Sequence, residues 1–216
     1  MINILFEDAD ILVLIKPAGT LSELSEAENS LPRMVGEERG VELFAVHRLD
    51  REVSGVMVYA KSPKAAAELS RQVADRSFEK EYLAIVEGVP AEPSATLSDL
   101  LFKDSRKNKS FVVSRKRAGV KEASLSYETV GDRDGRALVK IALHTGRTHQ
   151  IRVQFSSRKM PVLGDGKYGS SLREREIALA SYRIKFKHPR TKEFVEFSHL
   201  PEGDIWITTK PLIENM

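Results

Sequence analysis

The sequence has no cysteine among its 216 residues and only one tryptophan. Without cysteine, the chain can form neither a disulfide framework nor a zinc site built on thiolates. Its longest apolar run, Ile11 to Ile15, is far too short to cross a bilayer. The amino terminus also lacks the basic start and the small-residue cleavage site of a secretory signal. We therefore expect a soluble, cytoplasmic protein with no membrane partner.

Two patterns that would indicate a bound cofactor are incomplete. The histidines are scattered, and His144 and His149 have no supporting ligand nearby in the sequence. The segment GDGKYG at 164–169 fits the glycine pattern of a dinucleotide site, but Pro161 interrupts the strand that such a site needs before it. The sequence therefore predicts neither a metal site nor a dinucleotide site.

Alternating apolar residues predict antiparallel strands over 122–129, 137–143 and 182–187. Asp134-Gly135 supplies a turn between the first two of these strands. The segment 56–60 is apolar on both faces, which is typical of a central strand.

Helices are predicted over 63–76 and, from a weaker pattern, over about 29–38. In the first, Ser62 is suited to cap the helix and Pro63 occupies its first position. The fold class is therefore α+β, a mixed, mainly antiparallel sheet with flanking helices. Because neither an internal repeat nor an interdomain linker is visible, we expect one domain over residues 1–216.

Basic residues are concentrated between positions 103 and 121, although the net charge of the chain is only +3. This segment holds eight Lys or Arg and a single Asp, so the rest of the chain is net acidic. Such a cluster suits a polyanion, because each phosphate that is neutralised releases counterions. Arg115, Lys116 and Arg117 are its candidate RNA contacts. A solvated loop has the same composition, and composition alone does not separate the two.

The segment HRLDREVSG at 47–55 places an acid between two cations just before the central strand. Arg48 and Arg51 would lower the pKa of Asp50 and keep its carboxylate ionised in a low-dielectric cleft. An ionised, partly dehydrated carboxylate is a usable nucleophile. A salt bridge at the start of a strand is the more common explanation for an Asp in this setting, so this residue alone does not establish an enzyme.

The segment LHTGRTHQIRVQ at 143–154 carries a cation suited to partner a buried acid, Arg147. Thr148 is suited to cap a following helix. The apolar residues that follow argue for a strand instead, because they alternate with period two. They are Ile151, Val153 and Phe155.

The strand predicted around KEYLAIVEG at 80–88 carries Tyr82. Its ring could stack on a base, or its hydroxyl could move a proton. The alternative is a core aromatic with a satisfied hydroxyl. His149 and Gln150 are interpreted as hydrogen-bonded framework residues rather than catalytic ones.

Four segments in order resemble the RluA family of RNA pseudouridine synthases. HRLDREVSG followed by VMVYAK is similar to that family's signature, and DADILVLIKPAG at 8–19 to its first motif. KEYLAIVEG resembles its Tyr-bearing strand, and TGRTHQIRVQ with PVLGDGKYG its third motif and the loop after it. The resemblance implies the pseudouridine synthase catalytic fold over most of the chain. Because the motifs begin at residue 8, we expect no S4-like RNA-binding domain before them.

The resemblance also implies a role for each matching position. Asp50 would be the nucleophile, and Arg147 the cation that pairs with it. Tyr82 would stack on the flipped uracil or act as a base, with Leu143 packed against it. Arg48 would hold the target strand open.

The function implied is isomerisation of uridine to pseudouridine in ribosomal or transfer RNA by a monomer without a protein partner. No cofactor is expected, because the reaction retains every atom. One alternative is a catalytically silent RNA-binding protein of the same fold. Another is a glycoside or nucleoside hydrolase, which usually needs a second carboxylate that these motifs do not offer.

Overall fold

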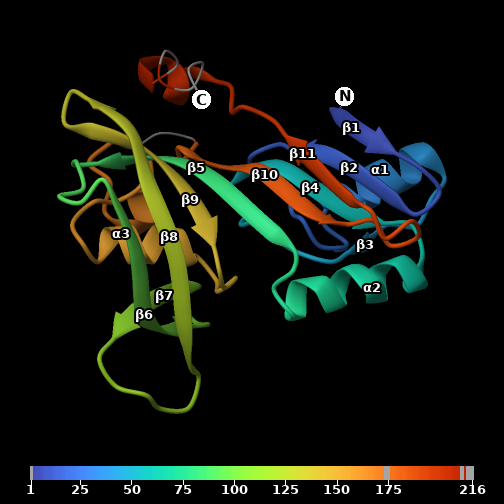
Figure 1. The fold of residues 1–216 in the computed structure, drawn as a ribbon, viewed down its shortest axis with the longest axis horizontal. Helices are drawn as coiled ribbons and strands as arrows, with labels where there is room; N and C mark the ends of the chain where they lie inside the picture. The colour runs from blue at the N-terminus through green and yellow to red at the C-terminus, as the bar shows by residue number, and fades with distance from the viewer. Residues whose placement is uncertain (1, 173–175, 210–211, 213–216) are drawn as a thin grey trace. The chain divides into compact units, whose positions relative to one another are not determined.

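A computed structural model describes residues 2–172, 176–209 and 212 (Figure 1). The chain forms two compact units. Unit 1 comprises Met1–Lys80 and Ala180–Pro201, and unit 2 comprises Glu81–Leu179 and Glu202–Met216. Within the described residues, no helix is long and apolar enough to span a bilayer.

Unit 1 is a mixed sheet with helices. Its strands are β1 (Ile4–Glu7), β2 (Ile11–Lys16), β3 (Phe44–Ala45), β4 (Ser54–Ala60), β10 (Leu179–Lys187) and β11 (Phe194–Ser198), and its helices are α1 (Leu31–Arg39) and α2 (Pro63–Ala74). Strand β4 pairs with β2 and β3 in antiparallel fashion and with β10 in parallel. The order therefore runs β1-β2-β4-β10, with β11 beside β10.

The central strand of unit 1 is β4, as the apolar segment 56–60 predicted. All five of these residues have no exposed surface. At the start of the strand, Gly55 adopts φ 116°, and a Cβ there would lie 2.2 Å from the carbonyl oxygen of Ser181. Only glycine fits this close approach between β4 and β10.

The helix predicted over 63–76 is α2, and both of its start signals are confirmed. The Ser62 side chain accepts a hydrogen bond from the Ala65 amide, and Pro63 begins the helix. Leu69 is fully buried in the core that α2 shares with β2, β4 and β10. The weaker prediction over 29–38 corresponds to α1.

Unit 2 is built on an antiparallel sheet in the order β5-β9-β8-β6-β7. Its elements are β5 (Glu79–Glu87), β6 (Ser94–Asp104), β7 (Lys109–Val113), β8 (Val120–Arg133), β9 (Arg136–Leu143), α3 (Gln150–Ser156) and the 3-10 helices Gly166–Tyr168 and Asp204–Thr209. The predicted turn joins β8 and β9 through Asp134 and Gly135, both at positive φ. Together, the two units confirm the α+β class with mainly antiparallel pairing.

Of the two interpretations of the segment after position 150, the helix is confirmed as α3, and the strand favoured by the apolar alternation is wrong. Six of its seven residues are buried, so its pattern lacks the polar face that marks a surface helix. Thr148 is not its cap. His149 precedes the helix in a left-handed conformation, with φ 52°.

Candidate functional site

Asp50 lies half-buried in the loop that leads from β3 into β4. The Val53 amide donates to the Asp50 carbonyl oxygen at 3.1 Å, which closes the loop immediately before the strand begins. Because β4 is buried from Gly55 to Ala60, this bond ties the backbone of Asp50 closely to the core of unit 1.

A buried lysine fixes the carboxyl-terminal side of this loop. Lys16, the last residue of β2, is 0% exposed. Its Nζ donates to three carbonyl oxygens, those of Pro17 (3.0 Å), Arg51 (3.1 Å) and Val53 (2.7 Å). Burial lowers the pKa of Lys16 to about 8, and the negative charges of Glu52 and Asp50 oppose that shift. A protonated amine near Asp50 is therefore part of the loop's own support.

A serine fixes the amino-terminal side. The Ser22 hydroxyl donates to the Leu49 carbonyl oxygen at 2.9 Å and accepts from the Leu49 amide at 3.2 Å. Ser22 is held in turn by Tyr59, whose hydroxyl donates to the Ser22 carbonyl oxygen at 3.0 Å. Side chains from outside the loop thus hold the peptide groups on both sides of Asp50.

The arginines that flank Asp50 in the sequence make contacts elsewhere in unit 1. Arg48 is exposed and forms an ion pair with Glu23 at 3.2 Å. Arg51 donates from Nε to the Gly19 carbonyl oxygen at 3.1 Å. Lys16 was not among the predicted site residues, although a lysine that ends the apolar run ILVLIK is an available signal.

His47, the first residue of the same motif, has a structural role. It is 8% exposed, and its Nε2 accepts a hydrogen bond from the Val58 amide of β4 at 3.2 Å. Burial, assisted by the charge of Lys80, lowers the pKa of His47 to about 3. The ring is therefore neutral at physiological pH and anchors the start of the loop to β4.

In unit 2, Tyr82 and Leu143 lie on one face of the sheet. Tyr82 is 5% exposed on β5 and pairs with Ile141 of β9. Directly opposite residues point to the same face, as do residues two apart on one strand. Leu143 of β9 therefore lies on the Tyr82 face, diagonally offset from it.

Arg147 lies half-buried in the loop between β9 and α3. Its amide donates to Gln150 Oε1 at 3.0 Å, and the Gln150 amide group donates to the Ser124 carbonyl oxygen of β8 at 3.1 Å. The Thr145 hydroxyl donates to the same Gln150 oxygen at 2.7 Å. The Arg147 side chain donates from Nε to the Glu122 carbonyl oxygen at 2.9 Å.

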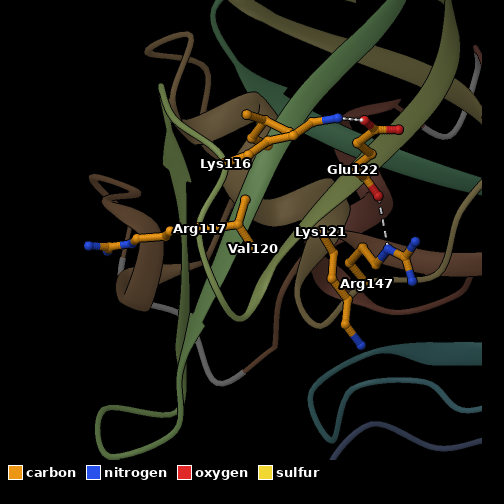
Figure 2. Close-up of a pocket in the computed structure, with 7 residues that line it drawn as sticks. Lys116, Arg117, Val120, Lys121, Glu122 and Arg147 are labelled. Carbon is orange, nitrogen blue, oxygen red and sulfur yellow. Dashed lines mark hydrogen bonds and ion pairs between the residues drawn. The ribbon is translucent and has the colours of Figure 1, made fainter.

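Arg147 and part of the basic segment line one pocket of about 550 Å³ (Figure 2). The pocket has four cations and one acid, together with two apolar residues: Leu100, Lys116, Arg117, Val120, Lys121, Glu122 and Arg147. Lys116 forms an ion pair with Glu122 at 2.5 Å. Figure 2 shows Lys116 and Arg147 both directed to Glu122, whereas Arg117 extends away from them. Two of the predicted RNA contacts, Lys116 and Arg117, thus line the same pocket as Arg147. The third, Arg115, is exposed in the same loop.

A buried ion pair, which no sequence pattern indicated, supports the helix that follows Arg147. Arg152 of α3 and Asp165 are 2% and 1% exposed, and two hydrogen bonds join them at 2.6 and 2.9 Å. His149 makes the framework contact expected of it, with Nδ1 2.9 Å from the Tyr168 hydroxyl. The segment 164–169 forms a 3-10 helix of three residues, which does not provide the long helix that a dinucleotide site requires.

One cluster in unit 1 has the residue types of a metal site. Ligand atoms of Asp8, Asp10 and His188 lie within 4.8 Å of one another. His188 Nε2 is 2.9 Å from Asp8, and Arg190 Nε is 2.6 Å from Asp10. Each carboxylate therefore already has a nitrogen neighbour from the protein, so the arrangement is explained as a network of side-chain contacts.

Comparison with known proteins places these motifs in a family. Residues 10–157 match the model of the RNA pseudouridylate synthase family. An uncharacterized RNA pseudouridine synthase of Aquifex aeolicus is 36% identical over 91% of this chain and 68% of its own length. The ribosomal large subunit pseudouridine synthase D of Zymomonas mobilis is 32% identical over 98% of this chain and 73% of its own length. The chain thus spans about two thirds to three quarters of these relatives.

Solved structures agree on the fold. The human RNA pseudouridylate synthase domain containing 1 superposes with a TM-score of 0.76 at 22% identity, over 98% of this chain and 94% of that one. The human RNA pseudouridylate synthase domain containing 4 superposes with a TM-score of 0.78 at 22% identity, over 98% of this chain and 93% of that one. The resemblance to the RluA family is confirmed, and the chain belongs to the RNA pseudouridylate synthases, which are isomerases.

Proposed function

We propose that this pseudouridine synthase uses Asp50 as its nucleophile on a uridine of ribosomal or transfer RNA. The observation that carries the proposal is the double support of the Asp50 loop, by Ser22 on one side and by Lys16 on the other. A reacting group must be held in a fixed position to be effective, and these contacts act on the peptide groups next to it. These contacts act on the backbone of the loop rather than on the carboxylate.

The chemistry needs a carboxylate but no redox partner. The bond between uracil N1 and ribose C1′ breaks, the base rotates, and a bond forms between C5 and C1′ before the C5 proton leaves. An ionised Asp50 serves this sequence by attacking C1′, by adding to C6, or by assisting an elimination from the ribose. The Lys16 ammonium holds the carbonyl groups of Arg51 and Val53 in the loop that carries this carboxylate.

Tyr82, Leu143, Arg147 and Arg48 complete the proposed set. Tyr82 stacks on the extruded uracil or moves its proton, with Leu143 packed beside it, and Arg147 pairs with the Asp50 carboxylate. Arg48 holds open the strand from which the nucleotide leaves. Extruding the base costs a few kcal/mol, and an aromatic stack returns about 1–3 kcal/mol.

RNA affinity is proposed to come from Arg115, Lys116 and Arg117, through phosphate contacts that carry no sequence information. All three side chains are exposed. Replacing them with Ala should weaken binding to every RNA and flatten its dependence on salt concentration. Selective loss of one RNA would instead mean that this segment reads sequence.

The substrate is proposed to be ribosomal RNA, because relatives that match almost the whole chain are named for the large ribosomal subunit. The protein is proposed to act as a monomer in the cytoplasm. Mapping pseudouridine in total RNA from cells with and without the protein identifies the modified position. A missing pseudouridine in transfer RNA alone would redirect the assignment to that substrate.

A tritium-release assay tests the catalytic role. RNA labelled at uracil C5 loses its label to water when C5 becomes the glycosidic carbon. Asp50→Asn should abolish release and keep RNA binding within a few-fold of the wild type. Asp132→Asn, at an exposed aspartate of β8, is the matched control and should retain full activity.

The alternatives give different outcomes in the same assay. Turnover by Asp50→Asn contradicts the nucleophile assignment. Release of free uracil indicates a hydrolase, and binding without either product indicates a silent RNA-binding protein.

A further inference from the structure

One face of the β6-β7-β8 region carries apolar side chains that the proposed catalytic roles do not use. Phe102 of β6 lies opposite Phe111 of β7 and opposite Val120 of β8. Directly opposite side chains share a face of the sheet, so these three form one row. Leu100 of β6, paired with Val113, extends the row along the same face.

Helix α3 packs against the other face of these strands. The cluster that joins them consists of Leu101, Ala123, Val153 and Tyr168. The neighbouring residues Leu100 and Phe102 alternate away from Leu101 and so away from this cluster. Phe111 is 36% exposed on the edge strand, and Leu100, Phe102, Val113 and Val120 are half-buried. The row is thus a partly exposed apolar surface of unit 2, here called the Phe102–Phe111 surface.

Cations surround this surface. The guanidinium of Arg117 lies over the Phe102 ring, 4.8 Å from its centroid. Leu100 and Val120 also line the cationic pocket, so the apolar row and that pocket are continuous. Aromatic rings next to a groove of positive charge are the features that bind single-stranded nucleic acid, because bases stack while the cations hold the backbone.

A second exposed phenylalanine gives a useful contrast. Phe194 of β11 is 60% exposed, and Lys185 and Lys187 lie 5.5 and 5.1 Å from its ring centroid. Its own strand carries Glu196, which is paired with Arg183. Phe194 therefore has nearby lysines but contributes nothing to the cationic pocket, whose lining residues all belong to unit 2.

We propose that the Phe102–Phe111 surface is a binding subsite for one unpaired RNA base other than the uridine that is isomerised. The base stacks on Phe111 and against the Arg117–Phe102 pair, and its phosphate is held by Lys116, which lines the pocket together with Leu100 and Val120. This inference rests on the proposed function in taking RNA as the ligand. An excess of positive charge favours RNA over a protein partner, for which charged residues are generally depleted at the centre of the interface.

The test uses a single-stranded RNA of about 12 nucleotides that contains one 2-aminopurine, a fluorescent base quenched by stacking. Phe111→Leu keeps an apolar side chain but removes the aromatic face. It should weaken binding by roughly 5-fold to 100-fold and lose the quenching, because one stacked base is lost. Phe111→Trp should restore both. Arg117→Lys keeps the charge but loses the planar group, so it should reduce the quenching.

Two control variants separate this inference from other effects. Phe194→Leu should bind and quench as the wild type does. Asp50→Asn should also retain affinity and quenching, so a failed catalytic assignment does not affect this measurement. Because Phe111 is at the surface, circular dichroism of Phe111→Leu should match the wild type.

Either of two results overturns the proposal. One is wild-type binding and quenching by Phe111→Leu. The other is RNA binding that is unchanged in Phe111→Leu while self-association in sedimentation is lost, since that result identifies a protein-docking surface instead.

Discussion

The two loops that carry Asp50 and Arg147 are supported by different chemistry. The Asp50 loop in unit 1 is held by the buried ammonium of Lys16, together with a serine hydroxyl. The Arg147 loop in unit 2 is held by the neutral side chains of Gln150 and Thr145 and by the half-buried guanidinium of Arg147 itself, which donates to the Glu122 carbonyl oxygen. Both loops are therefore fixed through backbone contacts, but only the first is supported by a fully buried charged group.

The two units therefore differ in where their buried charges lie relative to the loop that each unit contributes. In unit 1, the charged group that supports the loop is also one that interacts with the candidate nucleophile. In unit 2, the buried charges of Arg152 and Asp165 lie in and beyond α3, away from the loop's own hydrogen bonds. Disturbing charge should alter catalysis in the first case and stability in the second.

The largest effect on stability is expected from Arg152→Met. It leaves the Asp165 carboxylate buried without its bidentate partner, which should lower the free energy of unfolding by about 3–5 kcal/mol. Urea unfolding at constant pH measures this change. The control is Arg71→Met, which removes two ion pairs of an exposed arginine on α2 and should change stability far less.

The double variant Arg152→Met/Asp165→Asn checks the cause. It leaves no buried charge unpaired, so part of the lost stability should return. If Arg152→Met is as mild as Arg71→Met, the pair does not support α3 and the contrast between the units is wrong.

Lys16→Met should have the next largest effect, on catalysis rather than on binding. Without Lys16, the carbonyl groups of Arg51 and Val53 lose their shared donor, and Asp50 can shift. A displacement of about 1 Å is enough to lower the rate about 100-fold. The measurement is kcat for tritium release alongside the Kd for RNA, which should change little.

Lys64→Met is the matched control, because Lys64 is an exposed lysine of α2. It should leave both constants unchanged. A normal kcat for a folded Lys16→Met protein would show that the Asp50 loop keeps its geometry without the ammonium.

Acid should destabilise the protein through His47. Burial lowers the pKa of His47 to about 3 from the ordinary value of 6.5, so between these values the unfolded chain binds a proton that the folded one does not. The stabilisation is complete above about pH 6.5 and is lost as the pH falls towards 3. Going from about pH 7.5 to 5 should cost about 2 kcal/mol.

His47→Gln isolates this contribution. Glutamine keeps an acceptor for the Val58 amide but does not titrate, so its stability should fall less over the same range. Urea unfolding of both proteins at several pH values gives the difference, in which all other titrating groups cancel. Parallel curves would mean that His47 does not remain neutral in the folded state.

Local sequence patterns predicted the helices and strands that have regular periodicity. They did not predict features that depend on contacts between residues far apart in the sequence. The cap at Ser62 and the hairpin turn at Asp134-Gly135 were predicted correctly because their causes lie within a few residues. The sequence left helix α3 in conflict with a strand, because burial on nearly all sides leaves no polar face to detect. The support of the Asp50 loop was missed because Lys16 and Ser22 lie 27 to 37 positions from the groups that they hold.

The smallest effects are expected from removing one supporting hydroxyl group at each loop. Ser22→Ala removes the partner of both the amide and the carbonyl of Leu49, which is 5% exposed. Water reaches these groups poorly, so unfolding should become easier by about 1–3 kcal/mol. Thr145→Val removes contacts to Gln150 and Ser124 in a half-buried position, where water can replace them, and should cost about 0.5–1.5 kcal/mol.

Urea unfolding and tritium release, measured on both variants, complete this comparison. We expect Ser22→Ala to lose more stability and more kcat than Thr145→Val, since Ser22 acts on the residue next to Asp50 and Thr145 acts on Arg147 through Gln150. The reverse order would mean that the neutral contacts of unit 2 fix the reacting geometry more tightly than those around Asp50. In that case, the rigidity of the Asp50 loop must come from the Lys16 ammonium alone.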